Sequence, residues 1–191
     1  MKFFVEAIFS VASFCIFGLA DTVWAVECPS LAIARTFSVA DTHLLRGSFS
    51  IWDDFPPCQI GSPLQVDLFL VYSRSLNDSV PAQDAIEAVK DSFSNSHGWK
   101  KCISRVIGIG VDIDAEVDLY QLDHQHSNPL WVNGPNRQFE RTIRAVQDAE
   151  SGSYDLLYLM EMDSIPVQPF WLDRIIEKMS EEPEEFTILG R

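Results

Sequence analysis

Apolar residues form three β-like runs along this chain, and each run precedes a segment in which apolar residues recur every three or four positions. The runs are residues 65–73, 103–113 and 156–160. The segments with helical spacing are residues 82–93, 139–146 and 171–179, and a further strand is expected to begin at residues 186–189. The run at 156–160 is apolar at every position, which is typical of a strand covered on both faces. Strands that alternate with helices predict an α/β fold with a mainly parallel, twisted sheet and flanking helices.

The helical spacing also predicts which side chains face the core. Residues 82–93 place four apolar side chains on one face, namely Ala85, Ile86, Val89 and Phe93. Residues 139–146 do the same with Phe139, Ile143 and Val146. Residues 26–63 are richer in polar and turn residues, with an edge strand expected at 47–52 and a break at Pro56-Pro57. We therefore expect a lead-in segment over residues 26–63 and an α/β domain over residues 64–191.

The amino terminus has the pattern of a targeting segment. Lys2 precedes an apolar stretch at residues 7–20, and Val23-Trp24-Ala25 provides an end similar to a cleavage site, so a secretory signal peptide is predicted over residues 1–25. The stretch is shorter than the roughly 20 residues that a spanning helix needs, and an uncleaved signal anchor is the alternative. We expect the protein in the lumen of the endoplasmic reticulum or Golgi, or secreted. Membrane contact is expected only if this segment is retained.

Cysteine usage and one sequon agree with that compartment. Cys15 lies in the apolar leader, which leaves Cys28, Cys58 and Cys102 with three pairings open. Cys58 and Cys102 each lie just upstream of a predicted strand, on the same side of a parallel sheet, which favours a disulfide between these two. Asn77 begins an Asn-Asp-Ser sequence that matches an N-glycosylation site.

The charge balance limits the classes of partner. Lys and Arg number 14 against 28 Asp and Glu, which gives a net charge of −14. Broad electrostatic attraction to nucleic acid or to an anionic membrane is therefore not expected. A phosphate-bearing ligand needs local basic residues or a metal ion.

Two carboxylates end the run at residues 156–160. Glu161 and Asp163 lie two positions apart, and Pro166 stops the strand, so both acids are expected on one face where the chain leaves the sheet. Open α/β sheets bind ligands at this edge. Carboxylate oxygens suit Mg²⁺ or Mn²⁺, which complete their shells with water and substrate phosphates. The alternative is that both acids are solvated turn residues.

Glu161-Met162-Asp163, followed by Ile-Pro-Val at 165–167 and Trp-Leu-Asp at 171–173, resembles the metal-binding acid motif of nucleotide-sugar glycosyltransferases with the GT-A fold. The motif is usually Asp-x-Asp in that family. The resemblance implies that Asp163 binds the metal directly and that Glu161 supports the metal shell or contacts the donor ribose. It further implies a Rossmann-like GT-A sheet. Because such domains normally extend well past the motif, we expect an amino-terminal fragment.

The activity implied by this resemblance is metal-dependent transfer of a sugar from a nucleotide-diphosphate donor to an acceptor hydroxyl. The acceptor is a glycan, a protein or a lipid, and neither a catalytic base nor the choice between hexosyl and pentosyl transfer is assigned. A secreted, non-catalytic or vestigial α/β binding domain is the alternative function.

Four further residues are predicted to contact the donor. Arg137, Arg141 and Arg144 recur along one helix face, where a guanidinium can bind phosphate oxygens through two hydrogen bonds. The resemblance favours Arg137 and Arg141, while the alternative is an exposed face paired with acidic neighbours. Ser73 lies at the end of the first predicted strand, where the resemblance implies the start of a loop that contacts the nucleotide. Asp112 follows the second predicted strand and is a candidate for contacting the base or ribose, while the alternative is a solvated turn acid.

Overall fold

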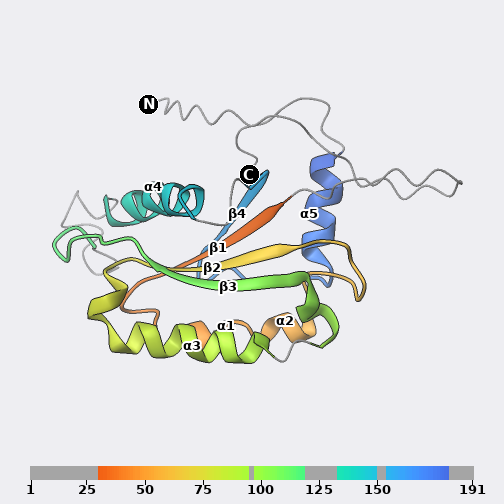
Figure 1. The fold of residues 1–191 in the computed structure, drawn as a ribbon, viewed down its shortest axis with the longest axis horizontal. Helices are drawn as coiled ribbons and strands as arrows, with labels where there is room; N and C mark the ends of the chain where they lie inside the picture. Colours follow the sequence, from red (N-terminus) through yellow and green to blue (C-terminus); the bar gives the residue numbers. More distant parts are fainter. Residues whose placement is uncertain (1–29, 95–96, 119–132, 150–153, 181–191) are drawn as a thin grey trace, which may run out of the picture.

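A computed structural model describes residues 30–94, 97–118, 133–149 and 154–180 (Figure 1). In this part of the chain four parallel strands form one sheet in the order β3-β2-β1-β4. The strands are β1 (Leu31–Phe37), β2 (Val66–Tyr72), β3 (Ile103–Gly110) and β4 (Leu156–Met160). The predicted α/β class with a parallel sheet and flanking helices is confirmed.

Helices cover both faces of the sheet. In Figure 1 α1, α2 and α3 lie below it, α4 lies above it, and α5 crosses one end. Their bounds are α1 (Leu45–Ser48), α2 (Ile51–Asp54), α3 (Val80–Ser94), α4 (Asn133–Gln147) and α5 (Trp171–Ser180), with short 3-10 turns η1 (Leu76–Asp78) and η2 (Gly98–Cys102). The three helices predicted from apolar spacing are confirmed as α3, α4 and α5. The strand expected at 186–189 lies outside the described residues.

The sheet contains a strand that the apolar pattern did not predict. β1 pairs with β2 on one side and with β4 on the other, although it lies within the segment expected to be a lead-in. Arg35 and Thr36 interrupt its apolar run, which hid the strand. The edge strand expected at 47–52 is wrong, because these residues belong to α1, α2 and the turn between them.

The two faces of the sheet differ in the size of their side chains. Leu31, Ile33 and Phe37 of β1 face a large core that includes residues of α1, α2, α3 and α5. Ala32 and Ala34 face the opposite side, where Val146 of α4 belongs to a smaller core. Small alanine side chains let α4 lie close to the sheet.

The buried face of α4 differs from the prediction. Gly134, Gln138, Thr142 and Val146 are buried, whereas Phe139 is 43% exposed. Gln138 Nε2 donates to the carbonyl oxygens of Phe37 at 3.1 Å and Val71 at 3.3 Å. Helix α4 therefore presents small and polar residues to the ends of β1 and β2, where strand carbonyls need donors.

Strand β4 is less covered than its apolar sequence predicted. Only Met160 is buried, and residues 156–159 are partly exposed. The reason is position, because β4 lies at the edge of the sheet formed by the described residues. Both faces are covered in part, because Leu156 and Tyr158 pack against the larger core while Leu157 and Leu159 pack against the smaller one.

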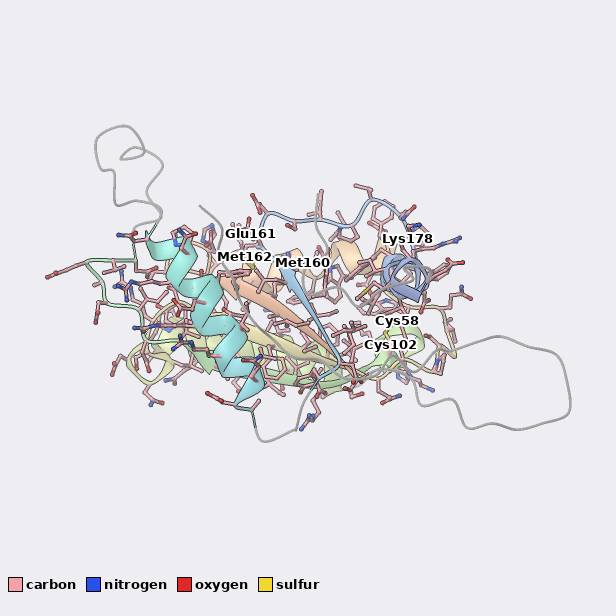
Figure 2. All side chains as sticks on the ribbon, turned by 90° about the horizontal axis from the view of Figure 1, so that it is seen from above. Cys58, Cys102, Met160, Glu161, Met162 and Lys178 are labelled. Atoms are coloured by element: carbon pink, nitrogen blue, oxygen red, sulfur yellow. A yellow bond between two sulfur atoms is a disulfide. The ribbon has the colours of Figure 1, made fainter. Side chains whose placement is uncertain are left out.

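A disulfide joins Cys58 to Cys102, the pairing that the sequence favoured. Figure 2 shows it well apart from Glu161 and Met162 at the end of β4. The loop before Cys58 is also joined to the start of α5, because Phe170 N donates to Pro56 O at 2.6 Å. Asp173 Oδ2 accepts from Gln59 N at 2.8 Å. These bonds fix the start of α5, the helix that follows the acid motif.

Candidate functional site

The strand order brings the carboxyl ends of β1 and β4 side by side. The chain moves from β1 to β2 and β3 in one direction across the sheet, and β4 then pairs with the other side of β1. Open α/β sheets commonly bind ligands at the carboxyl edge where the strand order reverses, the switch point. Glu161 directly follows β4 and Ser38 directly follows β1, so the acid motif lies at the switch point. The segments after β1 and β4 pack on the same face of the sheet, because Trp52 of α2 and Trp171 of α5 belong to one core.

Glu161 and Asp163 occupy a tight turn rather than the end of a strand. Strand β4 ends at Met160, and Ser164 N donates to Glu161 O at 3.1 Å. The strand therefore ends well before Pro166, and the expectation that strand alternation places both acids on one face is wrong, because neither acid belongs to the strand. Both side chains are exposed, and neither has a hydrogen-bond or ion-pair partner among the described residues. Both carboxylates are therefore available to a ligand.

Beneath this turn lies a fully buried arginine. Arg35, on β1, has 0% of its surface exposed. Its Nη1 donates to Met160 Sδ at 3.0 Å, and its Nη2 donates to Met162 O at 3.1 Å and Ser164 O at 3.4 Å. All three acceptors belong to the end of β4 and the turn that follows it.

The surroundings of Arg35 are mostly apolar. Its guanidinium carbon lies 5.3 Å from the ring centroid of Phe49 and 6.0 Å from that of Trp52. Burial lowers the pKa of Arg35 to about 10, an effect opposed by the charge of Asp163 and by Tyr158, so the side chain is charged at neutral pH. A fixed positive charge therefore faces the acid turn from inside the protein.

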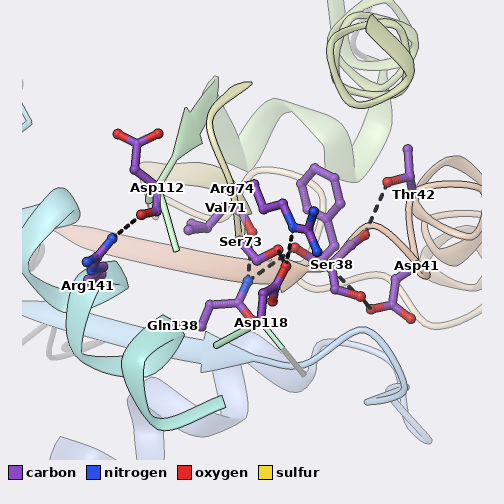
Figure 3. A network of polar contacts seen from close by, with 11 residues as sticks. Ser38, Asp41, Thr42, Val71, Ser73, Arg74, Asp112, Asp118, Gln138 and Arg141 are labelled. Atoms are coloured by element: carbon purple, nitrogen blue, oxygen red, sulfur yellow. Dashed lines mark hydrogen bonds and ion pairs between the residues drawn. The ribbon is translucent and has the colours of Figure 1, made fainter. Parts of the chain in front are cut away.

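A second polar group lies at the carboxyl ends of β2 and β3 (Figure 3). Ser73 is buried, and its hydroxyl donates to Asp118 Oδ2 at 2.9 Å. Arg74 Nε donates to the same oxygen at 2.8 Å. The other carboxylate oxygen of Asp118 is buried and has no hydrogen-bond partner in the described part of the chain. Ser73 is thus committed to this network rather than directed freely into solvent.

Arg141 and Asp112 are brought together, but not as two ligand-binding side chains. Arg141 Nη1 donates to Val111 O at 2.7 Å and also to Asp112 O. Asp112 has a left-handed backbone with φ of 49°, a conformation that Asp tolerates better than most residues. Arg141 therefore holds the loop that follows β3, while the carboxylate of Asp112 is exposed.

The remaining arginines of α4 differ from each other. Arg137 is exposed, and the adjacent Gln138 donates to Phe37 O, which places this part of α4 beside the carboxyl end of β1. Arg144 forms an exposed ion pair with Glu140 at 2.6 Å. The alternative interpretation, a surface ion pair, therefore describes Arg144.

The predicted residues form two groups along one edge of the sheet. Glu161 and Asp163 follow β4, whereas Ser73, Asp112 and Arg141 gather at the ends of β2 and β3. Strands β3 and β4 are separated by two strands, so their ends lie about 14 Å apart at the usual strand spacing. Asn77 is exposed in η1, on the connection that follows β2.

Sequence reasoning missed Arg35, Asp118 and Gln138. Arg35 is a lone charge inside the apolar run LAIARTF, and that interruption is a signal that a buried cation needs partners. Asp118 and Gln138 carry no comparable signal, because their contacts depend on how the strands are ordered.

The described residues contain no cluster of three or more His, Cys, Asp or Glu side chains that could hold a metal ion. Glu161 and Asp163 still fit a Mg²⁺ or Mn²⁺ site, because these ions commonly take one or two carboxylates and fill their shells with water and substrate phosphates. In the same part of the chain, no helix combines the length and the apolar character needed to cross a bilayer. Comparisons with protein-family models, curated proteins and solved structures find no match for this chain.

Proposed function

We propose that this protein is a metal-dependent glycosyltransferase that moves a sugar from a nucleotide-diphosphate donor to an acceptor hydroxyl. The observation that carries the proposal is the position of Glu161 and Asp163, two exposed carboxylates without a hydrogen-bond or ion-pair partner among the described residues, on the turn at the switch point between β1 and β4. A parallel sheet of order β3-β2-β1-β4 with the acid turn at its carboxyl edge supports a GT-A, Rossmann-like fold for the same domain. We place the protein in the secretory pathway.

In this mechanism the chain supplies binding and orientation on the donor side. Asp163 would hold a Mg²⁺ or Mn²⁺ ion directly, and Glu161 would support its shell or accept a hydrogen bond from the donor ribose. The chemistry that such an ion would supply is neutralisation of charge on the leaving diphosphate. Because the carboxylates of Glu161 and Asp163 project from a turn closed by a backbone hydrogen bond, they do not need to break protein contacts before binding.

The arginines of α4 take different parts in the same proposal. Arg137 is exposed beside the end of β1 and is our candidate for contacting the diphosphate. Arg141 spends two hydrogen bonds on the carbonyls of Val111 and Asp112, so we assign it to holding the loop after β3. That loop then faces the nucleotide, and the buried Ser73 supports the loop from beneath, because its carbonyl accepts a hydrogen bond from Ile113 N at 2.8 Å.

Metal-linked nucleotide binding tests this proposal. We would measure binding of UDP and GDP by calorimetry, with and without MnCl₂, for the wild type, for Asp163→Ala and for Asp91→Ala. Asp91 is an exposed acid on α3 and provides a control that changes the net charge equally. We expect Mn²⁺-dependent binding of one nucleotide in the wild type and in Asp91→Ala. In Asp163→Ala we expect affinity to fall by about tenfold or more.

Two results contradict the proposal. One is the absence of metal-dependent binding for both nucleotides in the wild type. The other is equal binding by the wild type and Asp163→Ala. Either result favours a non-catalytic α/β domain.

A further inference from the structure

Arg35 is placed where a charged residue is costly. It lies at 0% exposure in a strand with neighbours on both sides, and no described carboxylate forms an ion pair with it. Its Nε is buried and has no hydrogen-bond partner among the described residues. A buried, incompletely satisfied cation usually lowers stability relative to an apolar side chain of similar size. Stability of the core therefore does not account for an arginine at this position.

The contacts of Arg35 all point to one segment. Its Nη2 reaches Met162 O at 3.1 Å and Ser164 O at 3.4 Å, the carbonyls on either side of Asp163. Its Nη1 reaches Met160 Sδ at 3.0 Å, at the end of β4. A planar guanidinium can hold several separate acceptors in fixed directions, which a single ammonium group cannot do. The guanidinium thus fixes the backbone before and after the proposed metal ligand.

Aromatic rings fix the guanidinium in turn. Phe49 and Trp52 lie over it at 5.3 and 6.0 Å, and these two rings meet edge to face at 4.8 Å. Both aromatic residues are buried, so Arg35 has little freedom to leave the turn. The two aromatic rings therefore hold Arg35 in place, and Arg35 holds the acid turn in place.

We propose that Arg35 is the positioning residue of the acid turn, holding Glu161-Met162-Asp163 in its metal-binding arrangement and balancing the two carboxylates when no metal is bound. This inference rests on the proposed function. Arg35 reaches the site only through the turn, because its side chain is fully buried. Its two contributions, position and charge, have opposite effects on metal affinity. Loss of position weakens binding, whereas loss of a nearby positive charge strengthens binding of a cation.

Two substitutions separate these contributions. Arg35→Lys keeps the positive charge and loses the planar guanidinium. Arg35→Met removes both, and its apolar side chain is compatible with the aromatic surroundings. Arg174→Met is the control, because Arg174 is exposed on α5 and, among the described residues, forms a surface ion pair with Glu177. We would measure Mn²⁺-dependent UDP and GDP binding of the full chain by calorimetry. Amide hydrogen exchange would follow Ser164 N, whose bond to Glu161 O closes the turn.

We expect Arg35→Lys, which loses only the positioning contacts, to bind the metal-linked nucleotide about tenfold more weakly, a change of about 1.4 kcal/mol. Arg35→Met should be weakened less, because the loss of the positive charge opposes the loss of position, and the control should be unchanged. The Ser164 amide should exchange faster in both variants, while the amides of β1 and β2 stay protected. If Arg35→Met does not fold, Arg35→Lys alone decides the test. Tighter Mn²⁺ binding by Arg35→Met with unchanged Arg35→Lys shows a charge effect only and overturns the positioning role.

The two proposals fail in different ways. If the wild type binds nucleotide with Mn²⁺ and loses binding in Asp163→Ala, but both Arg35 variants bind normally, only the role of Arg35 is overturned. Unchanged exchange at Ser164 in both variants overturns it as well. If the wild type itself shows no metal-dependent binding, the proposed function fails and the role of Arg35 fails with it.

Discussion

Reduction of the Cys58–Cys102 disulfide should cost this protein a large part of its stability. The two cysteines are 44 positions apart, and both are buried at 0% and 4% exposure. In the chain-entropy description, releasing a loop of that length lowers the free energy of unfolding by about 4 kcal/mol. Because whole domains are stable by only about 5–15 kcal/mol, the reduced protein should be marginal.

Urea unfolding monitored by tryptophan fluorescence measures this effect. The ring centroid of Trp52 lies 6.0 Å from that of Trp99 and 5.3 Å from that of Trp171. Their fluorescence therefore reports on the packing of α2, η2 and α5 against one another. For a slope of about 2 kcal/mol per molar urea, a loss of 4 kcal/mol moves the midpoint down by about 2 M. The comparison is between oxidised and reduced wild type, which have the same side chains.

The double variant Cys58→Ala/Cys102→Ala provides the control. Its urea midpoint should equal that of the reduced wild type. Reductant should not change this midpoint, even though the variant still contains Cys15 and Cys28. If oxidised and reduced wild type differ by less than about 1 kcal/mol, the loop-entropy reasoning is refuted for this protein.

Two further predictions concern residues outside the acid turn. Tyr154→Phe should lower the free energy of unfolding by about 1.5 kcal/mol, because the Tyr154 hydroxyl donates to the buried carboxylate of Asp67 at 2.6 Å; an unchanged urea midpoint would argue against it. Asn77 is exposed in a sequon, so protein made through a eukaryotic secretory pathway should lose mass on treatment with a peptide N-glycosidase. Asn77→Gln should abolish that shift, Ser79→Thr should retain it, and an untreated mass equal to that of the bare wild-type chain would contradict the prediction.

The parts of the fold that the sequence predicted are those with a continuous local pattern. β2 is buried at every position, and α3 buries Ile86, Val89 and Phe93 at helical spacing, so both elements were predicted. β1 was missed because Arg35 breaks its apolar run. Arg35 is tolerated there only because its acceptors lie on a segment about 125 residues later, a contact that no local pattern contains.

The position of the acid turn could be predicted because, unlike β1, it depends on a local pattern. Glu161 and Asp163 follow an apolar strand directly, so their place at the edge of a parallel sheet could be inferred from neighbouring residues alone. Their support could not, because it depends on β1 lying next to β4. The exposure of Phe139 has a similar cause. Gln138 faces the sheet because it donates hydrogen bonds to the carbonyls of Phe37 and Val71, so the next residue, Phe139, faces outward.

The most direct test of the proposed function is to locate Mn²⁺ in crystals grown with MnCl₂ and UDP or GDP. We predict an anomalous scattering peak at the switch point between β1 and β4, at direct ligand distance from the Asp163 carboxylate, with the nucleotide diphosphate on its other side. A nucleotide bound elsewhere, or a Mn²⁺ peak that does not contact Asp163, would contradict the account.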